Sequence, residues 1–184
     1  MAEIVLVTGG CRSGKSSYAL RLAESQSGSK LFVATCPVLD EEMNYRIERH
    51  KAERAAGGWD SLEEETSLAE AIRKSKNYDC ILVDCLTLWI NNLMYHANNQ
   101  INEDDIRDKV IDVIAACEEY SGRIIFVTNE VGFGIVPEHP EVRRYRDLVG
   151  RANQTLGTVS DRLVLVVCGV PVNLKGQAEY DSLG

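Results

Sequence analysis

A glycine-rich stretch near the N-terminus, GGCRSGKS, has the residue types and the spacing that bind nucleotide phosphates. It fits the pattern GxxxxGK[ST] of the phosphate-binding loop, or P-loop. Glycines let the backbone curl so that its N–H groups point at phosphate oxygens, Lys15 reaches the outer phosphates, and Ser16 can bind Mg²⁺. The alternative is a plain strand-to-helix turn. The residues predicted to bind phosphate are Gly9, Gly10, Cys11, Arg12, Ser13, Gly14, Lys15 and Ser16.

The carboxylate of Asp84 is a second candidate for nucleotide chemistry. A P-loop enzyme needs a carboxylate near the magnesium ion, usually at the end of a neighbouring buried strand. Asp84 ends the apolar run ILV within CILVDC, residues 80–85. We therefore expect Asp84 to bind Mg²⁺ or the nucleotide. Because it also precedes an expected helix, the alternative is that Asp84 only caps that helix.

A single histidine, His50, stands among basic residues in MNYRIERHKAER, residues 43–54. Arg46, His50 and Arg54 recur every four residues, so a helix over residues 40–54 would align them on one face. The cations around it, Lys51 included, favour a neutral imidazole, whose lone pair can attack phosphorus while they neutralise phosphate charge. The spacing alone leaves open that these side chains form only a solvated, charged helix end.

The elements that must position these residues alternate along the chain. Apolar runs predict buried strands over residues 3–7, 30–36, 80–85, 123–127 and 163–169, and residues 59–64 predict a short strand. Helical patterns cover residues 14–25, 40–54, 67–75, 86–97, 105–119 and 141–162. We find no two-residue hairpin turn between strands. The alternation predicts one α/β domain over residues 1–184, with a mainly parallel central sheet flanked by helices.

The fourth of these buried strands ends in a polar pair, Asn129 and Glu130, and then enters a loop with two glycines and two prolines, VGFGIVPEHP. Ligands of parallel sheets gather at the carboxyl ends of the strands. Residues 132–137 therefore either close over a ligand or form a structural turn.

Composition narrows the class of partner. The net charge of −8 argues against broad binding to nucleic acid, and no apolar run approaches the length that spans a membrane. The N-terminus lacks the basic start of a signal peptide, which favours a cytoplasmic location. Six cysteines form no CxxC pair, as expected for reduced thiols rather than for zinc or disulfides. A small-molecule partner is expected.

Four segments together resemble, in order and spacing, the bifunctional adenosylcobinamide kinase / adenosylcobinamide-phosphate guanylyltransferase family of cobalamin biosynthesis. They are VTGGCRSGKS, DEEMNYRIERHKAER, ILVDCLTLW, and VTNEVGFGIVP followed by RRYRDLVGRANQ. The resemblance covers nearly the whole chain, and RIxxHxxxR and TNEVGxGIVP are its most specific parts. It implies a P-loop NTPase fold similar to the recombinase-ATPase type and assembly as a homotrimer.

The resemblance also implies two reactions. The first transfers the γ-phosphoryl group of ATP or GTP to the hydroxyl of the aminopropanol arm of adenosylcobinamide. The second transfers GMP from GTP to adenosylcobinamide phosphate, releases pyrophosphate and passes through a guanylyl-histidine. His50 occupies the family's histidine position, which favours the nucleophile over the solvated helix end.

Further nucleotide contacts follow from the resemblance alone. Cys36 stands where a serine is common, which favours a backbone contact there, and Glu64 or Glu65 could substitute for Glu63. Besides the P-loop and Asp84, the implied contacts are Ala34, Thr35, Cys36, Lys51, Ala52, Glu53, Arg54 and Glu63.

Two other functions compete with this interpretation. One is a P-loop kinase of another small alcohol, in which His50 is only structural. The other is a nucleotide-dependent switch or assembly protein that hydrolyses slowly. Covalent retention of the α-phosphate of GTP on the chain would separate the bifunctional enzyme from both.

Overall fold

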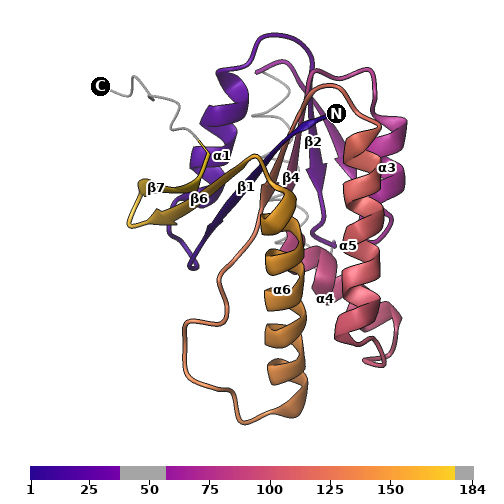
Figure 1. Ribbon diagram of the computed structural model, residues 1–184, viewed down its shortest axis with the longest axis vertical. Coiled ribbons are helices and arrows are strands. Elements are labelled where there is room, and N and C mark those ends of the chain that lie inside the picture. Colours follow the sequence, from indigo (N-terminus) through magenta and orange to yellow (C-terminus); the bar gives the residue numbers. More distant parts are fainter. Residues whose placement is uncertain (38–56, 177–184) are drawn as a thin grey trace.

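The protein has an α/β fold, which a computed structural model describes over residues 1–37 and 57–176 (Figure 1). The strands within those residues are β1 Glu3–Gly9, β2 Lys30–Ala34, β3 Trp59–Glu63, β4 Cys80–Asp84, β5 Arg123–Val127, β6 Arg162–Val167 and β7 Val170–Lys175. The helices are α1 Lys15–Glu24, α3 Leu68–Lys74, α4 Leu86–His96, α5 Glu103–Glu118 and α6 Pro140–Val159.

The described strands form one sheet in the order β3-β2-β4-β5-β1-β6-β7. Each neighbouring pair from β3 to β6 is parallel, and only β6 and β7 are antiparallel. The predicted mainly parallel sheet with flanking helices is therefore confirmed. The helix expected over residues 40–54 lies outside the described residues.

Both faces of the sheet are covered, which explains why β1 is apolar at successive positions rather than at alternate ones. Ile4 and Leu6 point into a core shared with α3, α4, α5 and α6. Val5 and Val7 point to the opposite face, into a core shared with α1. Figure 1 shows α1 on one side of the sheet and α3, α5 and α6 on the other.

The connection between β6 and β7 differs from the sequence prediction. We predicted no two-residue hairpin, but Cys168 and Gly169 join β6 to β7 in one, and Val167 pairs with Val170. Cys168 has φ 52° and Gly169 has φ 82°. Positive φ at both central residues suits the right-handed twist of a hairpin. Pro171 is tolerated because β7 is an edge strand, where a missing backbone donor costs little.

Candidate functional site

The P-loop lies between the end of β1 and the start of α1, as its pattern requires. Gly14 precedes the helix with φ 96°, a left-handed conformation that glycine adopts without steric cost. Lys15 begins the helix and is only 9% exposed, and its Nζ donates to the carbonyl oxygen of Gly10 at 3.2 Å. The lysine ammonium is thus held over the loop that it is predicted to serve.

Close packing explains the first glycine of this loop. A Cβ on Gly9 would lie 2.5 Å from the carbonyl oxygen of Val166 and 2.7 Å from Ser13 Oγ. Gly9 therefore allows β1 to leave the sheet directly beside β6. Among the other loop residues, Cys11, Arg12 and Ser16 are exposed, so their side chains are accessible to a ligand.

Asp84 ends β4 at the same edge of the sheet, because the carboxyl ends of parallel strands meet there. It is half-buried and lies in register with Ala34 of β2 and Val127 of β5. Thr35 and Cys85, the residues that follow β2 and β4, are joined by two hydrogen bonds. Thr35 Oγ1 donates to the carbonyl oxygen of Cys85 at 2.7 Å and accepts from its N–H at 2.9 Å. The expected contacts Ala34, Thr35 and Cys36 thus lie beside Asp84.

The thiol of Cys36 reports the charges at this edge. Burial, followed by the negative charges of Asp84 and Glu65, raises the pKa of Cys36 above its ordinary value. Two carboxylates therefore lie close enough to this thiol to disfavour its thiolate. These carboxylates make the surroundings of Cys36 negatively charged.

Glu63 ends β3, and Glu64 and Glu65 follow it. Glu63 is exposed and lies in register with Ala34. Glu64 Oε1 accepts from the N–H groups of Thr66 and Ser67 at 2.9 and 2.6 Å, so this carboxylate holds the turn before α3. Glu64 is thereby the weakest substitute for Glu63 as a nucleotide contact.

Five predicted site residues lie outside the described residues. They are His50, Lys51, Ala52, Glu53 and Arg54. Their roles remain predictions.

A polar network beside the P-loop was only partly predicted. Glu130 Oε1 accepts from Thr8 Oγ1 at 3.1 Å and from Asn153 Nδ2 at 3.2 Å. Asn153 Nδ2 also donates to the carbonyl oxygen of Asn129 at 3.1 Å. Asn129 Oδ1 is buried and has no hydrogen-bond partner among the described residues. Position after β5 had indicated Asn129 and Glu130, whereas nothing in the spacing indicated Asn153 on α6.

Comparison with known proteins decides the family. The family model described as "Cobinamide kinase / cobinamide phosphate guanyltransferase" matches residues 5–174. The chain belongs to this family. The resemblance predicted from the sequence segments is thereby confirmed.

Curated members of the cobinamide kinase family are similar along almost their whole length. The bifunctional adenosylcobalamin biosynthesis protein CobU of Escherichia coli is 37% identical over 182 residues, which cover 94% of this chain and 99% of the relative. CobU of Salmonella typhimurium has the same identity and coverage. CobP of Pseudomonas aeruginosa is 40% identical over 173 residues, covering 94% and 97% of the two chains.

The donor set of this cobinamide kinase family member fits Mg²⁺. The ion prefers oxygen ligands and is usually held by one or two protein groups together with substrate phosphates. Ser16 offers a hydroxyl at the start of α1, and Asp84 offers a carboxylate at the same edge of the sheet. Within residues 1–37 and 57–176, no cluster of three or more His, Cys, Asp or Glu side chains could hold a metal by itself.

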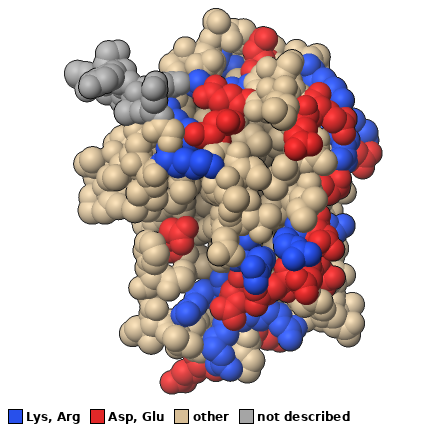
Figure 2. Space-filling view, in the orientation of Figure 1, with Lys and Arg blue, Asp and Glu red and all other residues tan. Residues whose placement is uncertain are grey.

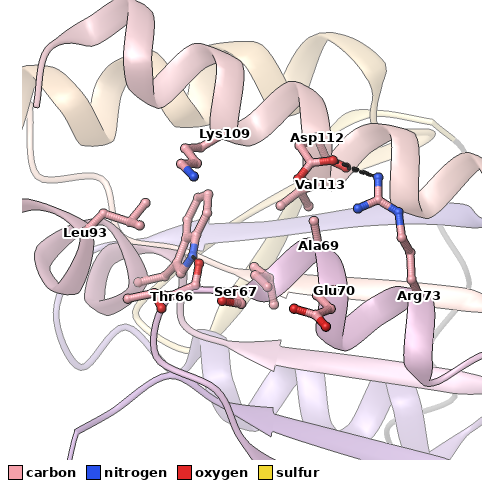
Figure 3. Close-up of a pocket in the computed structure, with 11 residues that line it drawn as sticks. Thr66, Ser67, Ala69, Glu70, Arg73, Leu93, Lys109, Asp112 and Val113 are labelled. Atoms are coloured by element: carbon pink, nitrogen blue, oxygen red, sulfur yellow. Dashed lines mark hydrogen bonds and ion pairs between the residues drawn. The ribbon is translucent and has the colours of Figure 1, made fainter. Parts of the chain in front are cut away.

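A pocket of about 390 Å³ lies away from the P-loop, where α3, α4 and α5 meet (Figure 3). Trp89 forms part of its wall and donates through Nε1 to the carbonyl oxygen of Thr66 at 2.9 Å. Across the pocket, Arg73 pairs with Asp112 at 2.7 Å. None of the described residues that line the pocket is a predicted site residue.

The surface of this cobinamide kinase family member mixes both signs of charge. Figure 2 shows acidic and basic side chains interspersed over the visible face. Arg151 of α6 pairs with Glu103 of α5 at 2.8 Å. Arg143 of the same helix donates to the carbonyl oxygens of Pro137 and Glu138. These two arginines serve local structure. Among the described residues, no helix has the length and apolar character needed to cross a membrane.

Proposed function

We propose that this chain phosphorylates adenosylcobinamide with ATP or GTP and then transfers GMP from GTP to adenosylcobinamide phosphate. The products of the second reaction are adenosylcobinamide-GDP and pyrophosphate. The observation that carries the proposal is the match of residues 5–174 to the cobinamide kinase family, in a chain whose Lys15 lies over a P-loop. One domain would serve both reactions, because the described strands form one sheet with the P-loop at its carboxyl edge.

In the kinase reaction, the P-loop N–H groups and Lys15 hold the β- and γ-phosphates. Ser16 and Asp84 would hold Mg²⁺, which neutralises charge on the phosphates when bound. The hydroxyl oxygen of the aminopropanol arm attacks the γ-phosphorus. The bond from that phosphorus to the bridging oxygen breaks, so that the nucleoside diphosphate leaves, and the hydroxyl proton is lost to a base or to solvent.

In the transfer reaction, a neutral imidazole nitrogen of His50 attacks the α-phosphorus of GTP and pyrophosphate leaves. A phosphate oxygen of adenosylcobinamide phosphate then attacks the same phosphorus, which frees the histidine. Arg46, Lys51 and Arg54 would neutralise the phosphates during both steps. Residues 51–54, Ala34 to Cys36 and Glu63 are proposed nucleotide contacts. Ala34 lies in register with Asp84 on one side and with Glu63 on the other, and Thr35 is hydrogen-bonded to Cys85. These neighbours support the proposed contacts at Ala34 to Cys36 and at Glu63.

Labelling tests the covalent step directly. The protein is incubated with GTP labelled at the α-phosphate and then denatured, and radioactivity that remains on the chain is counted. A phosphoramidate is lost in acid and survives alkali, so the retained label should show that pattern. His50→Ala should abolish retention, and His139→Ala is the matched control. Equal labelling of His50→Ala would disprove the nucleophile, and unlabelled wild-type protein would favour the simple kinase.

The assembly and the location are part of the same proposal. We expect a homotrimer, which light scattering measures in solution. We also expect a cytoplasmic protein. All six cysteines are free, as in a reducing compartment.

A further inference from the structure

The segment between β5 and α6 exposes an unusual amount of apolar side chain. Phe133 is 80% exposed, Ile135 is 95% exposed and Val136 is 60% exposed. Residues of these types are usually buried, and several together on one loop often mark a binding surface. Figure 1 shows this segment extending beyond the carboxyl edge of the sheet, alongside the first part of α6.

The inner end of this segment is attached to the P-loop. The N–H of Glu130 donates to the carbonyl oxygen of Gly9 at 3.1 Å. The carboxylate of the same residue accepts from Thr8 at 3.1 Å. A ligand lying along the segment would therefore have one end at the predicted phosphate site.

The outer end is attached to α6. Arg143 Nη1 donates to the carbonyl oxygens of Pro137 and Glu138 at 2.9 and 2.6 Å. Between the two attachments, Gly132 and Gly134 flank Phe133, and a Cβ on either glycine would meet no atom of the described residues within 4 Å. The apolar tip thus has open space around it while both of its ends are fixed.

A hollow of about 270 Å³ between α4 and α6 begins close to the outer end. It is lined by the exposed aromatic ring of Tyr95 and by Val142, together with the amide side chains of Asn91 and Asn99. This combination suits a ligand with broad apolar faces and amide groups at its rim.

We propose that residues 131–136 are the apolar contact for the corrin ring of the acceptor substrate. This inference rests on the proposed function, in which a corrinoid must place one hydroxyl at the γ-phosphate. The corrin ring is wide, has apolar faces and carries amide side arms, so most of the substrate must lie outside the P-loop. The segment that carries the exposed side chains of Phe133, Ile135 and Val136 starts beside the P-loop and leads away from it.

The test compares two identical substitutions at exposed isoleucines. Ile135→Ser removes a side chain from the proposed surface, and Ile111→Ser removes the same side chain from the outer face of α5. Ile135→Ser should raise KM for cobinamide about tenfold, because it removes one apolar contact from the ligand. KM for ATP and covalent labelling by GTP alone should stay unchanged. Ile111→Ser should match wild-type protein in every assay.

Equilibrium dialysis with cobinamide, which absorbs visible light, provides a measure of binding that does not depend on turnover. Phe133→Ser with Ile135→Ser should weaken binding more than either change alone. Leu174→Ser tests the competing exposed apolar surface on β7. If it weakens cobinamide binding and Ile135→Ser does not, the proposed surface is wrong.

Three further outcomes would also overturn the inference. If Ile135→Ser changes the oligomeric state measured by light scattering and leaves cobinamide binding intact, a second copy of the chain covers the loop. If wild-type protein neither binds nor phosphorylates cobinamide, the proposed function fails and this inference fails with it. If wild-type protein and Ile135→Ser phosphorylate cobinamide with equal KM for cobinamide, this inference is refuted while the proposed function stands.

Discussion

The backbone N–H of Gly169 donates to the carbonyl oxygen of Ser13 at 2.8 Å, so the turn between β6 and β7 lies directly against the P-loop. A Cβ on Gly14 would approach Gly169 Cα to 3.3 Å, which is tighter than an ordinary van der Waals contact. The hairpin therefore supports the P-loop from the side, and the absence of a side chain at Gly14 allows the contact.

Gly9→Ala should destabilise the protein through a backbone clash. The new Cβ would lie 2.5 Å from the carbonyl oxygen of Val166, so β1 and β6 must shift apart. We expect a loss of about 1–3 kcal/mol in the free energy of unfolding, measured by urea denaturation without nucleotide. Gly10→Ala is the control, because its Cβ would meet no atom within 4 Å. Equal stability of the two variants would contradict the packing argument.

Thr35→Val should destabilise the sheet where β2 and β4 end. The threonine side chain is fully buried and makes two hydrogen bonds with the backbone of Cys85. Valine keeps the shape but leaves a buried N–H and a buried carbonyl without this partner, which costs about 2–3 kcal/mol. Thermal unfolding measures the loss. Thr158→Val, at an exposed position on α6, should change stability by less than about 0.5 kcal/mol.

Lys15→Ala should abolish phosphoryl transfer while the fold persists. Removing the ammonium takes away charge stabilisation of the outer phosphates, so we expect kcat for cobinamide phosphorylation to fall at least about a hundredfold. Lys74→Ala removes an exposed lysine of α3 that pairs with Glu70 of the same helix at 2.6 Å. It should retain wild-type kcat. Wild-type turnover by Lys15→Ala would remove the P-loop lysine from the reaction.

Stability should fall in alkaline solution because of a buried thiol. Burial raises the pKa of Cys80 from 9.0 to about 11. Between these values, the unfolded chain loses the thiol proton while the folded chain keeps it. The free energy of unfolding therefore falls as pH rises, by about 1.4 kcal/mol per pH unit for this group. Cys80→Ala should make the measured slope shallower by that amount between pH 9 and 11, and an unchanged slope would contradict the assignment.

Much of the fold could be predicted from the sequence because apolar runs such as IVLV need cover on both sides. The chain supplies that cover as helices between strands, which makes parallel pairing the natural outcome. The hairpin at Cys168 and Gly169 escaped prediction for a physical reason. Cys-Gly is not one of the usual turn pairs, and proline is rare inside strands, although an edge strand such as β7 tolerates it.

In the candidate site, too, local features could be predicted and contacts between distant segments could not. The P-loop spacing and the place of Asp84 at a strand end are local features, and the sheet brings them to one edge. The contact between Asn153 and Glu130 arises only when α6 packs across the sheet, so no local pattern indicates it. The turn before α3 engages the carboxylate of Glu64, a contact that the run of three glutamates did not indicate, and the glutamate that contacts the nucleotide stays a prediction.

The position of β1 in the sheet has a consequence for how the chain folds. Its partners are β5 and β6, with Glu3 beside Arg123 and Val5 beside Arg162. Contacts between residues so far apart in sequence form slowly, because a long loop must close before they contribute stability. During synthesis, β1 must wait for most of the chain to leave the ribosome before either neighbour is available. The P-loop is therefore made long before β5 and β6, and it acquires its folded conformation only after them.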